Sequence, residues 1–172
     1  MILSDFLYSP QRHDHRGSPD GDALREQDAL VDAALLEVKF DATLMSLWLL
    51  FDCRGTLHMD DGNTAVVMVH QVTDFRWSGT PFGQRRWRSV ASWSPVLNDT
   101  TFSATLKVLN VGATAPDTLY LTGTCGEFHV GDIPGGDDAP PDFTSAADEE
   151  IRAGLASWNS PFTPIHSSHH CA

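Results

Sequence analysis

The sequence predicts a mainly β protein of the α+β class, built as an antiparallel β-sandwich or a curved sheet of six to seven strands, with an N-terminal and a C-terminal helix. Three observations predict this fold. Apolar and polar residues alternate with a period of two in several short segments between residues 36 and 130. Turn-forming residues, such as the Asp61-Gly62 pair, separate these segments. Helical apolar spacing occurs only toward the two ends of the chain.

The length of 172 residues fits a single domain. Residues 1–22 read as a flexible N-terminal arm, because the stretch from residue 9 is polar and rich in Pro, Gly and Asp. The first eight residues, MILSDFLY, have a second interpretation as an apolar segment docked on the body. Residues 23–160 form the β-rich domain with its flanking helices, and residues 161–172 form a C-terminal tail.

Two segments have helical spacing. Residues 23–35 carry a partial apolar stripe behind a capping Asp20 or Asp22, although the C-terminal part of this segment also fits a strand. The second helix starts at Ser145, has three acidic residues in its first turn and ends before Pro161.

The strands are predicted from their side-chain pattern. Residues 36–43 alternate cleanly, as in a half-buried strand, and residues 44–54 are apolar on both faces, as in a central strand. Residues 64–72 are dense in Val and give the clearest strand of the chain. The remaining predicted strands are 75–77, 85–93, 101–111 and 118–130, the last with bulges at Gly123 and Gly126.

The chain is strongly acidic. It has 23 Asp and Glu against 11 Lys and Arg, a formal net charge of −12. Such a charge repels phosphate backbones and anionic lipid surfaces, which argues against nucleic acid or membrane as the partner, and it attracts a basic protein. The candidate docking surface consists of acidic residues in and after a Pro/Gly-rich loop: Asp132, Asp137, Asp138, Asp142, Glu149 and Glu150. The alternative interpretation is a hydrated acidic surface that serves solubility alone.

No sequence motif predicts catalysis. The chain lacks the GxSxG, HExxH, SxxK, GxGxxG and Walker A patterns, so no catalytic residue, cofactor or metal is predicted. The best metal-like cluster is His166, His169, His170 and Cys171, but it lies in the predicted tail without a second set of ligands. The same holds for His13-Asp14-His15 in the arm, and the acidic run lacks the spacing of a calcium loop.

Residues 75–93 interleave arginines with aromatic residues. Such a combination can stack on bases or bind a partner. Alternation favours a simpler arrangement, with Trp87 facing the core and Arg86 and Arg88 facing water.

The three cysteines are an odd number without a CxxC pair, which predicts free thiols rather than a disulfide framework. Cys53 and Cys125 read as buried and Cys171 as exposed. No signal peptide or membrane-spanning stretch is visible, which predicts a cytoplasmic protein.

Three segments together carry a family resemblance: VKFDATLMSLWLLFDCRG, GNTAVVMVHQVTDFRWSG and CGEFHVGDIPG. The middle of the chain, about residues 34–134, resembles the YxiG-like family of bacterial immunity proteins, with a Leu-rich second hairpin strand that ends in an acid and a Val-x-Asp-aromatic segment at Val72–Phe75. The resemblance implies a bacterial protein that neutralises a toxin by binding it, without catalysis.

The leading functional prediction is therefore a non-enzymatic protein-binding module of the immunity type, whose acidic surface occludes the basic active-site cleft of a toxin such as a nuclease. A second class is an enzyme or small-ligand binder with a pocket in the curved sheet, for which the candidate residues are Trp48, His70, Trp77, Trp87 and His129. A third class is a scaffold or assembly subunit. The sequence makes no prediction of oligomeric state.

Overall fold

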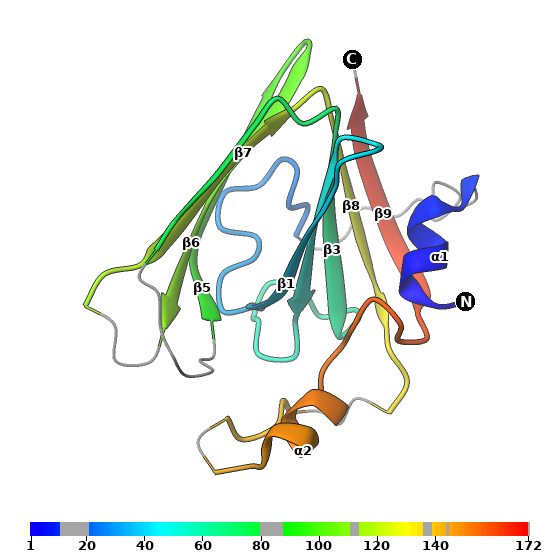
Figure 1. Ribbon diagram of the computed structural model, residues 1–172, viewed down its shortest axis with the longest axis vertical. Coiled ribbons are helices and arrows are strands. Elements are labelled where there is room, and N and C mark those ends of the chain that lie inside the picture. Colours follow the sequence, from blue (N-terminus) through cyan, green and yellow to red (C-terminus); the bar gives the residue numbers. More distant parts are fainter. Residues whose placement is uncertain (11–20, 80–87, 111–113, 136–138, 144, 172) are drawn as a thin grey trace.

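The computed structural model describes residues 1–10, 21–79, 88–110, 114–135, 139–143 and 145–171. These residues form one antiparallel sheet of nine strands and two short helices, which confirms the mainly β class and exceeds the predicted six to seven strands (Figure 1). The elements are α1 (Leu3–Tyr8), β1 (Ala34–Asp41), β2 (Ser46–Asp52), β3 (Thr64–His70), β4 (Asp74–Ser78), β5 (Arg88–Asn98), β6 (Thr101–Asn110), β7 (Asp117–Gly123), β8 (Cys125–Asp132), α2 (Asp148–Ala153) and β9 (Thr163–Cys171).

The strand order is β4-β7-β6-β5-β1-β2-β3-β8-β9, and the junction between β5 and β1 divides the sheet. β1 pairs with β2 along its whole length, but the register between β1 and β5 contains one residue pair, Ala34 and Ser89. A four-stranded half (β4-β7-β6-β5) and a five-stranded half (β1-β2-β3-β8-β9) therefore lean apart, and the segment 21–33 lies between them (Figure 1).

The strands at the centre of the five-stranded half are covered on both faces. Every residue of β2 is buried, which confirms the central strand expected from its double apolar pattern. Leu47, Leu49 and Phe51 point into the main core between the two halves of the sheet. Trp48 and Leu50 point the other way, into a second cluster that also contains residues of β3 and α1.

The segment 21–33 fills the main core but is not the predicted helix. Its chain runs through turns, and Asp28 and Asp32 have positive φ values of 60° and 68°. The segment makes hydrogen bonds within its own turns, such as that from the Glu26 N–H to the Asp22 carbonyl at 2.8 Å, and it also bonds to β5. The Asp28 N–H donates to the Trp93 carbonyl at 2.8 Å, and the Trp93 indole N–H donates to the Ala23 carbonyl at 2.6 Å. Its apolar residues are needed between the two halves, and this tertiary burial overrides the helical spacing.

The first residues of the chain are docked on the sheet. α1 buries Leu3, Phe6 and Leu7 in the cluster around Trp48 and Leu50. The structure thus agrees with the interpretation of MILSDFLY as an apolar segment docked on the body, and residues 11–20 of the expected arm lie outside the described residues.

Residues 163–171 form β9 where the sequence led us to expect a tail. β9 pairs with β8 from Thr163 to Cys171, and this strand ends the sheet. Backbone pairing at a sheet edge does not require apolar side chains, so the polar sequence TPIHSSHHC gave no strand signal.

The pairing of β8 with β9 places Cys125 directly opposite Cys171, and the two form a disulfide. The prediction of free thiols is therefore wrong for these two residues, because the odd cysteine count does not reveal strand register. Cys53 is buried and free, as expected. Burial is the main cause that raises the pKa of the Cys53 thiol far above its ordinary value, so this cysteine stays protonated.

The predicted strand over 118–130 is two strands, β7 and β8, and the chain reverses between them at Thr124. Gly123 lies so close to β3 that a Cβ atom there would be 2.4 Å from the His70 carbonyl oxygen. α2 is shorter than the predicted C-terminal helix and begins at Asp148 instead of Ser145. Within the described ranges no helix is both long and apolar enough to cross a membrane.

Candidate functional site

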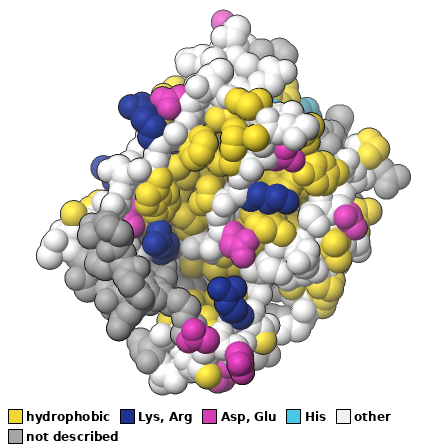
Figure 2. Space-filling model, in the orientation of Figure 1, with side chains coloured by type: hydrophobic (Ala, Val, Ile, Leu, Met, Phe, Trp, Pro, Cys, Tyr) yellow, Lys and Arg dark blue, Asp and Glu magenta, His cyan; other side chains and the backbone are white. Residues whose placement is uncertain are grey.

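Three segments that carry acidic residues lie at one end of the molecule, at the bottom of Figure 1. The β2–β3 connection, the end of β8 and the chain around α2 all lie there, because β3 and β8 are paired and α2 follows β8 (Figure 1). Figure 2 shows acidic side chains at this lower end. We call this surface the acidic end and define it as Asp60, Asp61, Asp132, Asp142, Asp148, Glu149 and Glu150.

An open groove of about 790 Å³ crosses the acidic end. Its lining combines the carboxylates of Asp60, Asp61 and Asp132 with apolar residues, among them Met59, Ile133 and Ile165. Arg54 also lines the groove, and its charge is paired with Asp52. Asp60 is exposed, and within the described residues it forms no ion pair with a basic side chain. Carboxylates beside apolar surface suit a Lys or Arg side chain, which has an apolar stem and a charged head.

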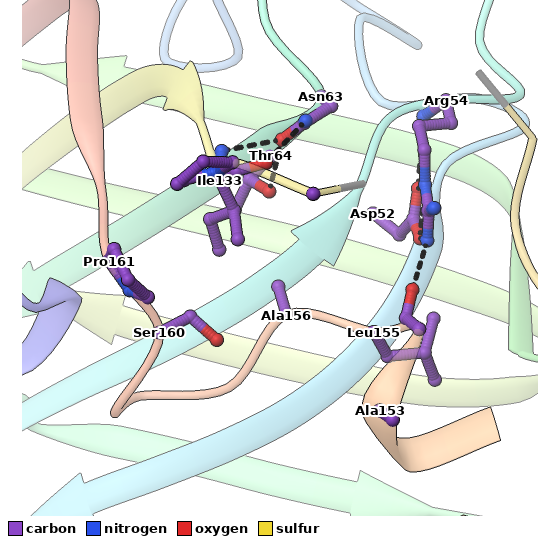
Figure 3. A pocket seen from close by; sticks show the side chains of 13 residues that line it. Asp52, Arg54, Asn63, Thr64, Ile133, Ala153, Leu155, Ala156, Ser160 and Pro161 are labelled. Atoms are coloured by element: carbon purple, nitrogen blue, oxygen red, sulfur yellow. Dashed lines mark hydrogen bonds and ion pairs between the residues drawn. The ribbon is translucent and has the colours of Figure 1, made fainter. Parts of the chain in front are cut away.

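The other two carboxylates of the groove have polar neighbours. Asp61 lies 3.3 Å from His166 Nε2, and Asp132 accepts a hydrogen bond from the Asn63 backbone N–H at 3.1 Å. The Asn63 side chain in turn bonds to Ile133, accepting from its N–H at 2.9 Å and donating to its carbonyl at 3.0 Å (Figure 3). These bonds fix the β2–β3 connection against the end of β8.

A buried ion pair fastens the chain around α2 to the same end. Arg54 pairs with Asp52 at 2.5 Å, and both side chains are less than one-tenth exposed. The Arg54 guanidinium also donates to the carbonyl of Gly154 at 2.7 Å (Figure 3) and to that of Ala139 at 3.2 Å. A buried pair of this kind holds geometry, because the loss of one partner would leave a buried charge without compensation. The acidic end is therefore braced by the sheet.

The predicted docking residues are only partly brought together. Asp132 lines the groove, and Glu149 and Glu150 are exposed on α2. Asp142 accepts a hydrogen bond from the Ser145 hydroxyl at 2.5 Å. Asp137 and Asp138 lie outside the described residues.

Sequence reasoning missed Asp60 and Asp61, because the Asp61-Gly62 pair was interpreted only as a turn. The pairing of Thr64 with Gly131 is what carries this turn to the acidic loop. A correct prediction that β3 and β8 are neighbours would have found them.

A chain of polar side chains runs across the face of the sheet that α1 covers. Ser46 Oγ lies 3.0 Å from His70 Nδ1, and His70 Nε2 lies 2.8 Å from Glu127 Oε1. Glu127 Oε2 lies 3.2 Å from His129 Nε2, and His129 Nδ1 lies 2.8 Å from Ser167 Oγ. Glu127 is the carboxylate partner that the sequence did not reveal, although its spacing of two from His129 places both on one face of β8.

Serine, histidine and carboxylate in a row are the groups of nucleophilic catalysis, but their burial here indicates a structural role. Ser46 is 1% exposed and His129 is fully buried, with the Phe6 ring of α1 packed edge-on against its imidazole at 5.2 Å. A nucleophile must be within reach of its substrate. The network instead satisfies buried polar atoms and fastens β2, β3, β8 and β9 to one another.

The metal-like residues are dispersed. Within the described residues no group of three or more His, Cys, Asp or Glu side chains is arranged to hold a metal ion. His166 faces Asp61, His170 Nε2 lies 3.0 Å from the Asn98 carbonyl oxygen, and Cys171 is in the disulfide. His13, Asp14 and His15 lie outside the described residues.

The residues predicted to line a pocket in the sheet do not lie together among the described residues. Trp48 and His129 are buried, and His70 belongs to the polar network. Trp77 is about two-fifths exposed and lines a cleft, and Trp87 lies outside the described residues.

No family model, curated protein or solved structure matches this chain. The resemblance to the YxiG-like immunity family stays a prediction from the sequence.

Proposed function

We propose that this protein is a non-enzymatic binding protein that uses its acidic end to hold a basic protein partner. The observation that carries the proposal is the groove at that end, where carboxylates from the β2–β3 connection and from β8 meet beside apolar side chains. Asp60 faces solvent there and forms no ion pair in the described part of the chain.

The charge of the whole chain supports this role. A net charge of −12 attracts a basic partner over a distance and speeds the encounter, and it repels acidic competitors. Once the partner arrives, the groove offers a Lys or Arg side chain both apolar contact and a carboxylate. The bracing by Arg54 and Asn63 keeps the groove formed before binding, which lowers the cost of ordering it.

The finer form of the proposal is an immunity protein. A toxin with a basic active-site cleft, such as a nuclease, would present the complementary charge, and an acidic protein seated on that cleft would exclude its substrate. The support is charge complementarity together with the resemblance stated above. The test is whether this protein binds the toxin encoded by an adjacent gene and protects cells that express that toxin. Failure to bind the toxin or to protect the cells would contradict the proposal of an immunity protein.

The binding proposal itself is tested with a basic peptide. We expect a labelled nona-arginine peptide to bind the protein, and nona-glutamate not to bind, with an affinity that falls as salt rises. The double substitution Asp60→Asn and Asp61→Asn should weaken binding about three- to tenfold, as expected for exposed charge pairs.

The matched control carries the same change in charge elsewhere. Asp5 and Asp99 are exposed and lie outside the acidic end, so Asp5→Asn with Asp99→Asn lowers the net charge equally. An equal loss of affinity in the two double variants would show that only net charge matters, and it would contradict a site at the acidic end.

A further inference from the structure

The two halves of the sheet are also separated between β1 and β4. Pairing between β1 and β5 is limited to Ala34 and Ser89, and β4 is the terminal strand of the four-stranded half. Farther along β1, the rings of Phe40 and Phe75 meet with their centroids 5.2 Å apart. Between these two points lies a cleft of about 290 Å³.

The cleft is mostly apolar, and it is exposed. Its apolar lining consists of Leu35, Leu36, Val38, Phe75, Trp77 and Leu119. Val38, Phe75 and Trp77 each keep about two-fifths of their surface exposed, and Figure 2 shows a band of hydrophobic side chains between the two halves of the sheet. Contiguous apolar surface of this kind marks a binding site more often than scattered exposed residues do.

Arg88 gives the cleft a cationic end. Its guanidinium lies over the Trp77 ring, 5.2 Å from the centroid, and its side chain is about one-third exposed. The guanidinium forms an ion pair with the buried carboxylate of Asp117 at 3.7 Å, a distance too long for a hydrogen bond, and that carboxylate accepts a hydrogen bond from Asn110 at 2.9 Å. Within the described residues the guanidinium makes no hydrogen bond, so its donors are available to a ligand.

We propose that this cleft binds a small amphiphilic carboxylate, with its apolar part along β1 and β4 and its carboxylate on Arg88. The fork of a guanidinium matches a carboxylate with two parallel hydrogen bonds, and stacking on Trp77 holds the fork in place. The volume lies at the lower end for ligand pockets, roughly 300 Å³ and above, which favours a small molecule. This site is separate from the acidic end and does not depend on the function proposed for it.

Glu37 supplies a comparison charge at the border of the cleft, where it is exposed on β1. Glu37 pairs with Leu50 of β2, whose side chain packs in the cluster around α1, so the Glu37 side chain points to that face of the sheet and away from Arg88. Removal of the Glu37 charge should therefore affect a carboxylate ligand much less than removal of the Arg88 charge, and in the opposite direction.

The test is titration calorimetry with decanoate, decanol and decylamine, each kept below its micelle concentration. We expect saturable binding of decanoate to the wild-type protein, at least tenfold tighter than decanol. Arg88→Gln should weaken decanoate at least tenfold and leave decanol unchanged, and Glu37→Gln should strengthen decanoate slightly.

Two valine substitutions locate the binding. Val38→Trp fills the cleft and should abolish decanoate binding, whereas Val96→Trp, at an exposed valine near the far end of β5, should not. If Val38→Trp does not fold, as judged by circular dichroism, the effect of Arg88→Gln on decanoate compared with decanol still tests whether the carboxylate binds at Arg88.

Several results would overturn the proposal. They are the absence of saturable decanoate binding, equal binding by the two valine variants, equal affinity for decanoate and decanol, and tighter binding of decylamine. Binding of a capped apolar peptide but of none of the three amphiphiles would assign the cleft to a protein segment. A dimer that Val38→Trp dissociates would assign it to a second copy of this chain.

Discussion

The two openings between the halves of the sheet differ in what covers them. Between β5 and β8 the chain inserts the segment 21–33, and Leu24 and Leu30 there are fully buried. Between β1 and β4 the inner face ends in Val38 and Trp77, which remain about two-fifths exposed. The sheet curves so far that each opening exposes apolar surface, and only the first is filled by a described segment of the chain. The inner face of the sheet thus adds to stability between β5 and β8, where residues 21–33 cover it, and it remains available for binding between β1 and β4.

Loss of the disulfide between Cys125 and Cys171 should have the largest effect on the free energy of unfolding, because β9 contacts the segment that fills the opening between β5 and β8. β9 holds the segment 21–33 through Ser168, whose hydroxyl donates to Asp22 at 2.6 Å, and Arg25 donates to the His169 carbonyl at 3.2 Å. The bridge joins cysteines 46 residues apart, for which the chain-entropy model gives about 4 kcal/mol. Cys171→Ser should lower the free energy of unfolding by up to that amount.

The measurement for the disulfide is urea unfolding of the oxidised protein, the reduced protein and Cys171→Ser. Thiol titration in denaturant supplies the control: one thiol per oxidised chain, from Cys53, and three after reduction. Three thiols before reduction, or no change in stability, would contradict the account.

Truncation of the filling segment should come next. Leu24→Ala opens a cavity in the main core and should cost about 3 kcal/mol. Val38→Ala, at the open cleft, should cost less than about 1 kcal/mol, because solvent already reaches that side chain. Denaturant unfolding measures both, and comparable losses would show that the two openings do not differ as described.

Glu127→Gln tests the structural interpretation of the buried network. The substitution keeps the shape but removes the charge that strengthens two hydrogen bonds to histidine, so we expect a loss of about 2 kcal/mol in unfolding free energy. A fluorophosphonate probe should leave Ser46 unlabelled by mass spectrometry. Labelling of Ser46 in the folded protein would contradict its burial and revive the enzyme alternative.

The smallest expected effect concerns the anchor of α1. Tyr8 donates a hydrogen bond to Asp41 at 2.8 Å, and this bond is the main cause that lowers the pKa of Asp41. A lowered pKa in the folded state adds stability above the pKa of the unfolded chain, roughly 3.9, and this stability is lost as the pH falls through the folded-state value. The difference in unfolding free energy between wild type and Tyr8→Phe should thus shrink from pH 7 to pH 2.5. A difference that stays constant or grows at low pH would contradict this role.

The residues explain why some parts of the fold were predictable and others were not. β2 and β3 carry long apolar or Val-rich runs, so local pattern alone finds them. The segment 21–33 and β9 were missed because their structure comes from contacts with distant strands: Asp28 bonds to Trp93, and β9 relies on its pairing with β8. A local period carries no information about such partners.

The candidate site divides in the same way. Asp132 and the acids of α2 were expected from a charge run, which is a local feature. Asp60, Glu127 and the cleft at Trp77 required knowledge of which strands are neighbours.

Hydrogen exchange of the protein with and without nona-arginine tests the central claim most directly. Binding at the acidic end predicts slower exchange in the β2–β3 connection and at the end of β8, around Asp60 and Asp132, with no change in β1 and β4. Slower exchange confined to β1 and β4, or an even change over the whole chain, would contradict it.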